Sequence, residues 1–117
     1  MNKVIGTVTT QQNPVLLGDH HIVTGVPVAD ETAAFAEGTI LAKGESGFIP
    51  YNPSTQGAVP VAVALEPLTD EADDAVIQAA VHGAVRRDKL LTSGGTAATD
   101  AVCESLRASG IYAIAGE

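Results

Sequence analysis

The side chains that could do nucleophilic chemistry are Cys103 and Ser46. Cys103 is the only cysteine of the 117 residues, so the sequence excludes an intrachain disulfide and a cysteine-based zinc site. A cysteine nucleophile needs a nearby base, and His20, His21 and His82 are all distant from it in sequence. Ser46 lies in Gly-Glu-Ser-Gly, which lacks the final glycine of a nucleophile elbow. These patterns favour a buried cysteine and a turn serine.

Three further groups of residues could bind a metal or an anion. His20 and His21 are adjacent, and neighbours on a strand point to opposite faces, so a strand would not let them share a metal. The acidic stretch 66–74 lacks the ligand spacing and the glycine of a calcium loop, so we expect a solvated loop. Gly94 and Gly95 precede a predicted helix without the lysine of a phosphate-binding loop. We therefore expect no metal site and no cofactor.

The charge of the chain argues against polyanionic partners. The chain carries 14 acidic and 6 basic residues, a formal net charge of -8, whereas a nucleic-acid binder needs clustered cations. Arg86, Arg87 and Lys89 lie close together, and we predict that they form either a solvated patch or an interface patch that pairs with an acidic face of a partner. No apolar stretch approaches the length of a membrane span, and the N-terminus lacks the pattern of a signal peptide. We expect neither a nucleic-acid nor a membrane partner.

The centre of the sequence predicts β-structure. Residues 39–43 and 48–51 flank a four-residue turn with glycine at both ends, the pattern of a β-hairpin. Pro50 cannot donate to a sheet ladder, so the second strand of this hairpin should lie at a sheet edge or bend there. Both faces of 59–65 are apolar, as in a strand buried on both sides. Residues 74–85 predict a further strand, one face of which carries Ile77, Ala79, Val81 and Val85.

The C-terminal third predicts one helix. Thr99 or the residue after it can cap the helix, and Val102 and Leu106 place apolar side chains on one face. Gly110 supplies the left-handed stop, and residues 111–114 follow as a closing strand.

The first 34 residues differ from the rest of the chain. A Thr-, Gln- and Asn-rich start is followed by an apolar stretch that is broken by glycine and proline. We predict an extended N-terminal arm over 1–34 that binds a partner, and a compact domain over 35–117. The fold class is mainly β (α+β), with one C-terminal helix.

Five segments form an ordered set that is more specific than any one of them. They are 38–44 (Gly-Thr-Ile-Leu-Ala-Lys-Gly), 48–52 (Phe-Ile-Pro-Tyr-Asn), 62–65 (Ala-Val-Ala-Leu), 81–85 with 89–90 (Val-His-Gly-Ala-Val and Lys-Leu), and 106–111 (Leu-Arg-Ala-Ser-Gly-Ile). This order resembles the head decoration proteins of tailed bacteriophages, of the lambda type. The resemblance spans about residues 35–114 and leaves 1–34 unmatched.

The resemblance implies a capsid-stabilising structural protein. Such proteins form homotrimers on the outer surface of the capsid, bridge neighbouring capsomers and stabilise the expanded head. It further implies assembly in the host cytoplasm, location on the virion, and no catalytic residues. In relatives the N-terminal arm contacts the major capsid protein. We predict that this contact is made here by Val4, Ile5, Val8, Val15, Leu16 and Leu17.

Two other function classes stay open on the sequence. One is a small β-rich module that binds a ligand, although the chain has only two Phe and two Tyr to stack on a sugar. The other is an enzyme that uses Cys103. Thiol labelling of the native protein separates the enzyme from the rest, and the mass in solution tests the trimer.

Overall fold

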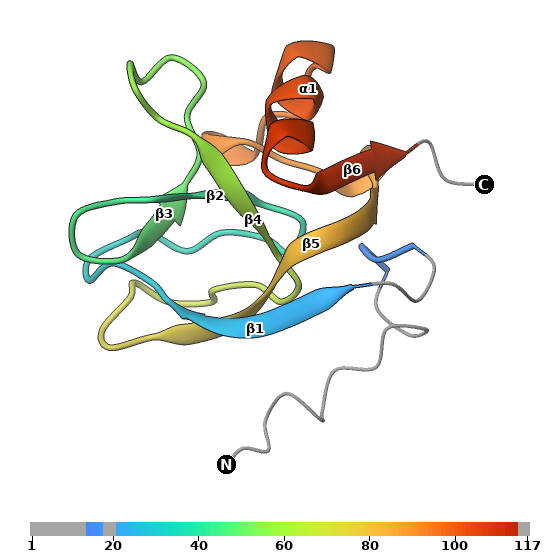
Figure 1. Cartoon of the computed structure of the whole chain (residues 1–117). Coiled ribbons are helices and arrows are strands. Elements are labelled where there is room, and N and C mark those ends of the chain that lie inside the picture. The colour runs from blue at the N-terminus through green and yellow to red at the C-terminus, as the bar shows by residue number, and fades with distance from the viewer. Residues whose placement is uncertain (1–13, 18–20, 115–117) are drawn as a thin grey trace.

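A computed structural model describes residues 14–17 and 21–114, and it confirms the prediction of a mainly β fold with one helix (Figure 1). The strands are β1 (Ile22–Pro27), β2 (Ile40–Lys43), β3 (Phe48–Pro50), β4 (Pro60–Ala64), β5 (Val76–Arg86) and β6 (Ile111–Ile114). The helix is α1 (Asp100–Ala108), and two short 3-10 turns, η2 (Arg87–Lys89) and η3 (Ser93–Gly95), separate β5 from α1.

The long strand β5 organises the sheet. In the strand order β1-β5-β4-β2-β3, β5 lies between β1 and β4, and these neighbours all pair antiparallel. Past the end of β4, β6 pairs with β5 in parallel, with Ile114 opposite Arg86. On the other side of β5, Arg86 N donates to Val15 O (2.7 Å) and Leu16 forms an antiparallel bridge with Val85. The C-terminal end of β5 therefore has a chain segment on each side.

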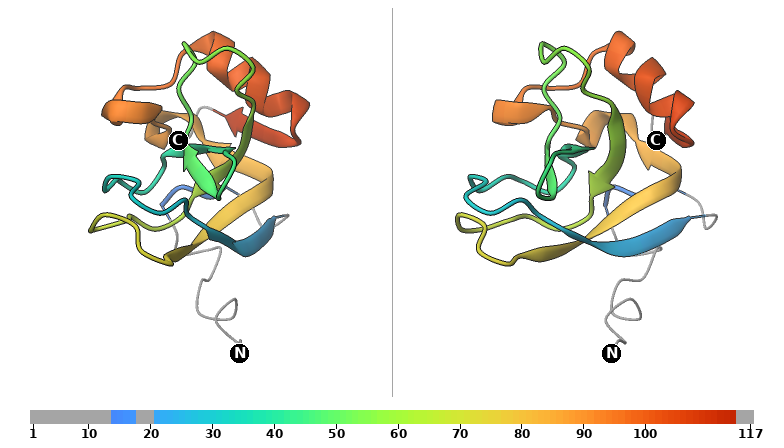
Figure 2. Two further views of the ribbon diagram at one scale, coloured as in Figure 1. Left: turned by 90° about the vertical axis from the view of Figure 1, so that its left-hand side faces the viewer. Right: turned by 60° about the vertical axis from the view of Figure 1, so that its left-hand side comes forward.

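Alternate side chains build two apolar clusters, one on each face of the sheet. In β4, Val63 belongs to the cluster that α1 covers, whereas Ala62 and Ala64 belong to the cluster on the opposite face. Leu65, directly after β4, joins Val63. This confirms the predicted burial on both sides for 62–65, but Val59, which lies before β4, is 56% exposed. Segments from the stretches 28–37 and 66–75 lie over the second cluster, away from α1 in both views of Figure 2.

The predicted hairpin is confirmed as β2 and β3. Gly44 N donates to Gly47 O (2.8 Å) across the turn, and β3 lies at the end of the strand order, so Pro50 is at a sheet edge as expected. On the outer side of β3, Phe48 O accepts a hydrogen bond from Ala29 N (3.0 Å). Because Pro50 has no N–H and Phe48 is already paired, this edge offers little to a further strand.

The predicted helix and its signals are also confirmed. The Thr99 hydroxyl oxygen accepts a hydrogen bond from Val102 N (3.4 Å), and Val102 and Leu106 are buried. Gly110 follows the last turn with φ +89°. A Cβ at this position would lie 2.9 Å from His82 Nδ1. The residue that turns the chain from α1 into β6 is therefore glycine for reasons of both conformation and space.

The described part of the predicted arm is built into the domain. Residues 22–27 form β1, which pairs with β5 along its whole length. Pro27 ends β1, and the next residue continues the pairing, with Val28 N donating to Ala75 O (2.9 Å). Val15 belongs to the core cluster under α1. Gly25 and Pro27 interrupt the apolar sequence pattern, but residues 22–27 still pair with β5, so this part of the predicted arm belongs to the domain, and residues 1–13 lie outside the described residues.

The prediction that Val85 shares the apolar face of β5 with Ile77, Ala79 and Val81 is wrong. Ile77 and Ala79 share a cluster and Val81 packs against it, as expected, but Val85 lies in the cluster on the opposite face. The pairing with β1 slips by one residue between Ile22 and Val23, because these neighbours lie opposite residues 82 and 80. A bulge of this kind changes which side chains face the core.

Candidate functional site

The predicted cationic patch lies at the C-terminal end of β5. Arg86 ends the strand, and Arg87 and Lys89 lie in η2. Arg86 Nε donates to Asp88 Oδ1 (3.5 Å), and the Arg87 guanidinium forms an ion pair with Asp100 at the start of α1. The structure thus brings the three predicted residues together but neutralises two of them, so surface pairing limits their charge.

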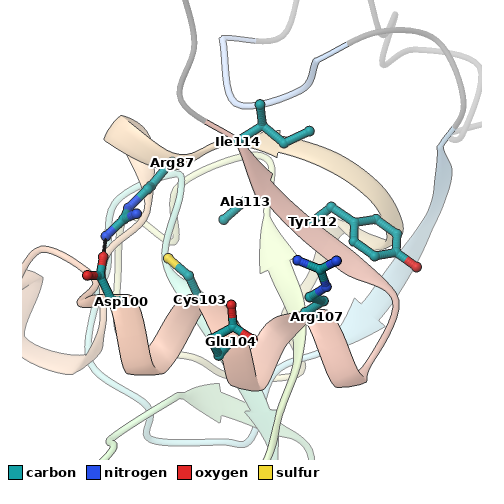
Figure 3. A pocket seen from close by; sticks show the side chains of 8 residues that line it. All are labelled: Arg87, Asp100, Cys103, Glu104, Arg107, Tyr112, Ala113 and Ile114. Carbon is teal, nitrogen blue, oxygen red and sulfur yellow. Dashed lines mark hydrogen bonds and ion pairs between the residues drawn. The ribbon is translucent and has the colours of Figure 1, made fainter.

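A groove of about 540 Å³ adjoins this patch, between α1 and β6 (Figure 3). Its helix wall consists of residues spaced i, i+3, i+4 and i+7, which share one face of α1. They are Asp100, Cys103, Glu104 and Arg107. Its strand wall is formed by Tyr112, Ala113 and Ile114, and Arg87 closes one end.

Local sequence signals position both walls of this groove. Val102 and Leu106 turn one side of α1 into the core, which leaves the flank with Cys103 beside β6. Ser109 Oγ donates to Pro60 O (2.7 Å) and so ties the end of α1 to β4. Gly110 then reverses the chain, and β6 runs back along the helix (Figure 2, left).

Cys103 is half-buried rather than fully buried, and its sulfur points into the groove (Figure 3). The residues that line the groove include no histidine. His82 instead stacks edge-on against Tyr112, with ring centroids 6.3 Å apart. His21 Nε2 lies 2.6 Å from Leu17 O and 3.2 Å from Ala84 O. Among the described residues, the groove therefore presents a thiol with no histidine in its lining, and its nearest acidic neighbours on α1 are Asp100 and Glu104.

The remaining candidates from the sequence are structural or remain undescribed. Ser46 lies exposed in the turn between β2 and β3. Gly94 and Gly95 adopt φ +79° and +78° in η3, and His20 lies outside the described residues. Within 14–17 and 21–114, no group of three or more His, Cys, Asp or Glu side chains is placed to hold a metal ion. In the same residues, no helix is long and apolar enough to cross a membrane.

The acidic stretch is more ordered than a solvated loop. Its backbone pairs with the segment that follows β1, because Ala72 N donates to Thr32 O (2.9 Å) and Leu68 N donates to Phe35 O (2.9 Å). These two segments form an exposed acidic ridge at the start of β5. Its carboxylates are those of Asp30, Glu31, Asp70, Glu71, Asp73 and Asp74.

Charge is therefore separated along β5. The chain has six Lys and Arg residues, of which Lys3 lies outside the described residues and Lys43 ends β2. The other four form a cationic cluster at the opposite end from the acidic ridge. This cluster consists of Arg86, Arg87, Lys89 and Arg107, which face the three acids Asp88, Asp100 and Glu104. The end of β5 beside the groove is the part of the described surface best able to accept an anionic partner.

The predicted arm contacts divide into two groups. Val4, Ile5 and Val8 lie outside the described residues. Val15 is 0% exposed and Leu16 is 6% exposed, because both pack in the core of this chain, so their side chains do not face a partner in this structure. Leu17 is half-buried.

Sequence reasoning missed the groove. The spacing of polar residues along 100–107 was visible in the sequence. The second wall depends on the parallel pairing of β6 with β5, for which the sequence contains no local signal. A second hollow, of about 710 Å³, lies between residues 32–36, the end of β3 and η3. Its lining carries no charged side chain.

Comparisons with protein-family models, with curated proteins and with solved structures find no match to this chain. The likeness to head decoration proteins therefore depends on the five ordered segments alone. What the chain does must be argued from the arrangement of its own residues.

Proposed function

We propose that this protein is a structural decoration protein, which binds the outer surface of a viral capsid as a homotrimer and stabilises the expanded head. The single observation that carries the proposal is that the first and the last described segments of the chain both pair with Arg86. Val15 accepts its backbone hydrogen bond on one side, and Ile114 is its register partner on the other. Val15 therefore lies beside the cationic cluster. In the proposal, an attachment arm formed by residues 1–13 leaves the domain at this point, which we call the arm exit, and acts together with the interface patch.

Exposed apolar side chains lie on several elements of the described surface. Several large apolar side chains are exposed, and they supply contact area for neighbouring copies and for the capsid. They are Ile22, Ile49, Val59, Val76, Tyr112 and Ile114. In a trimer three weak arm contacts act at once, and the high effective concentration converts them into firm attachment. The major capsid protein is the proposed partner, and the arm contacts are those of Val4, Ile5 and Val8.

To test the proposal, purified protein is mixed with expanded capsids, and the capsids are imaged by electron cryo-microscopy to measure decoration. Deletion of residues 2–13 should abolish decoration and leave the oligomer intact, because the deletion spares the bond between Arg86 and Val15. Serine in place of Val4, Ile5 and Val8 should weaken decoration at unchanged chain length. Serine in place of Gln11 and Gln12 is the matched control and should have no effect.

Two measurements can refute the proposal separately. A solution mass equal to the 11.9 kDa chain, at micromolar concentration, would contradict the trimer, whereas three times that mass is expected. Undecorated capsids with the full-length protein would contradict the capsid partner. Full decoration by the truncated protein would contradict the arm.

A further inference from the structure

The outer edge of β6 is open within the described residues. Gly83 N donates to Gly110 O (3.1 Å), and in a parallel ladder the next residue of β6 that is bonded to β5 is Tyr112. Ile111 and Ala113 therefore direct their N–H and C=O groups away from β5. In 14–17 and 21–114, no other backbone segment accepts or donates there. An edge of this kind is a template for a further strand.

The groove lies along this open edge. Ala113 lines it from β6, and the flank of α1 with Cys103 and Arg107 faces it across the gap (Figure 3). A slot between an edge strand and a helix is the arrangement in which an extended peptide adds to a sheet, held by main-chain bonds on one side and by helix side chains on the other. The volume of about 540 Å³ lies in the range of binding clefts. The added strand is short, because β6 has 4 residues.

The charged side chains that line the groove are two arginines and two carboxylates, so a partner carboxylate has only one favourable position in it. Arg107 has no ion pair within the described part of the chain, and Figure 3 shows its guanidinium between α1 and β6, near Tyr112. Arg87, at the other end, is already paired with Asp100. Glu104, on the same helix wall as Arg107, would repel a partner carboxylate at the centre of the groove. The complementary position for a partner carboxylate is therefore the Tyr112 end of the groove.

We propose that the groove between α1 and β6 binds an extended segment of the capsid partner, which adds to β6 as a further strand and places one carboxylate on Arg107. The inference rests on the proposed function, since the capsid is its partner. The groove is continuous with the arm exit, because Ile114 ends its strand wall and lies opposite Arg86. The acidic ridge at the other end of β5 disfavours binding of the same segment there.

Cys103 is a built-in reporter, because it is the only cysteine and it lines the groove. The test measures the rate at which fluorescein maleimide labels the full-length protein, free and bound to expanded capsids. The thiol should react in the free protein and should be protected at least about tenfold in the bound protein. If Cys103 is already protected from labelling in the purified protein without capsids, and dilution removes this protection, a second copy fills the groove. That result would overturn the proposal.

Two variants test the mode of binding. Ala113→Pro removes the outward N–H but spares the bonds to β5, so its capsid affinity should fall about tenfold, as expected for one lost hydrogen bond that leaves a buried acceptor unpaired. Arg107→Glu should lose at least as much affinity, and Lys43→Glu is the control for charge, because Lys43 ends β2, away from the groove. The melting temperature of each variant shows whether a loss of affinity comes from a loss of folding. If Ala113→Pro does not fold, Arg107→Glu and the labelling of Cys103 still test the proposal.

The outcomes distinguish this inference from the proposed function. If the wild type does not bind capsids, the proposed function is wrong, and the inference about the groove is wrong as well. If the wild type binds but Cys103 is labelled at the same rate, and both groove variants bind as the wild type does, the groove is not the site. Protection of Cys103 with full affinity of Ala113→Pro would exclude strand addition.

Discussion

Gly38 occupies a position where one added methyl group should disturb the domain strongly. Its φ is +89°, and a Cβ would lie 2.1 Å from Lys89 O, which is backbone and cannot rotate away. Gly38 N donates to Ala64 O (2.8 Å), and Gly38 O accepts from Leu91 N (3.0 Å). Relief of the clash in Gly38→Ala must therefore move the chain near Lys89 and break the bonds that join residue 38 to β4 and to the segment after η2.

The expected loss in the free energy of unfolding follows from these terms. The left-handed conformation costs about 1–2 kcal/mol for a residue with a side chain. Each of the two hydrogen bonds contributes about 1 kcal/mol. Gly38→Ala should therefore lose about 3–4 kcal/mol, measured by urea unfolding followed by far-UV circular dichroism at a fixed protein concentration.

Gly57→Ala is the matched control. Gly57 has φ +82°, but a Cβ there would have no heavy atom within 4 Å. This variant should lose only the conformational part, about 1–2 kcal/mol. Equal losses for Gly38→Ala and Gly57→Ala would refute the reasoning, because they would show that the approach of Lys89 O adds nothing.

Three further predictions concern α1. Leu106→Ala should lower the free energy of unfolding by about 2–5 kcal/mol, because Leu106 is fully buried; a loss under about 1 kcal/mol in the same urea assay would show a poorly packed core. Thr99→Ala should cost about 0.5–1 kcal/mol, at the low end for a helix cap since the bond to Val102 N is long at 3.4 Å, and Thr99→Asn should retain most of the stability. A double-mutant cycle of Arg87→Ala and Asp100→Ala should give a coupling under about 1 kcal/mol that vanishes in 1 M salt, because both side chains are exposed; a larger, salt-insensitive coupling would mean that the pair is desolvated.

The elements with strong local signals were predictable from the sequence. The hairpin of β2 and β3 follows from glycine at both ends of its turn, and Pro50 marked its edge position. The helix follows from its cap, its apolar spacing and Gly110. In each case the residues that decide the structure lie within a few positions of one another, so a local pattern carries the information.

The features that depend on long-range pairing were not predictable. β1 contains Gly25 and Pro27, yet it forms because β5 lies beside it. A Cβ on Gly25 would lie 3.1 Å from Val76 Cγ1 on β5, a contact that only the register between the strands creates. The groove depends in the same way on β6, which pairs with a strand about 28 residues earlier in the chain (Ile111 with Gly83) and must do so in parallel.

The separation of charge along β5 also governs how the molecule meets a partner. The strand spans about 30 Å, at roughly 3.3 Å for each residue, whereas salt at physiological strength screens charge within about 8 Å. An approaching anionic surface therefore senses the two ends of the molecule independently. The acidic ridge repels it, whereas the cationic cluster, whose charge three carboxylates largely offset, does not. Most productive encounters should then occur with the groove and the arm exit already turned toward that surface.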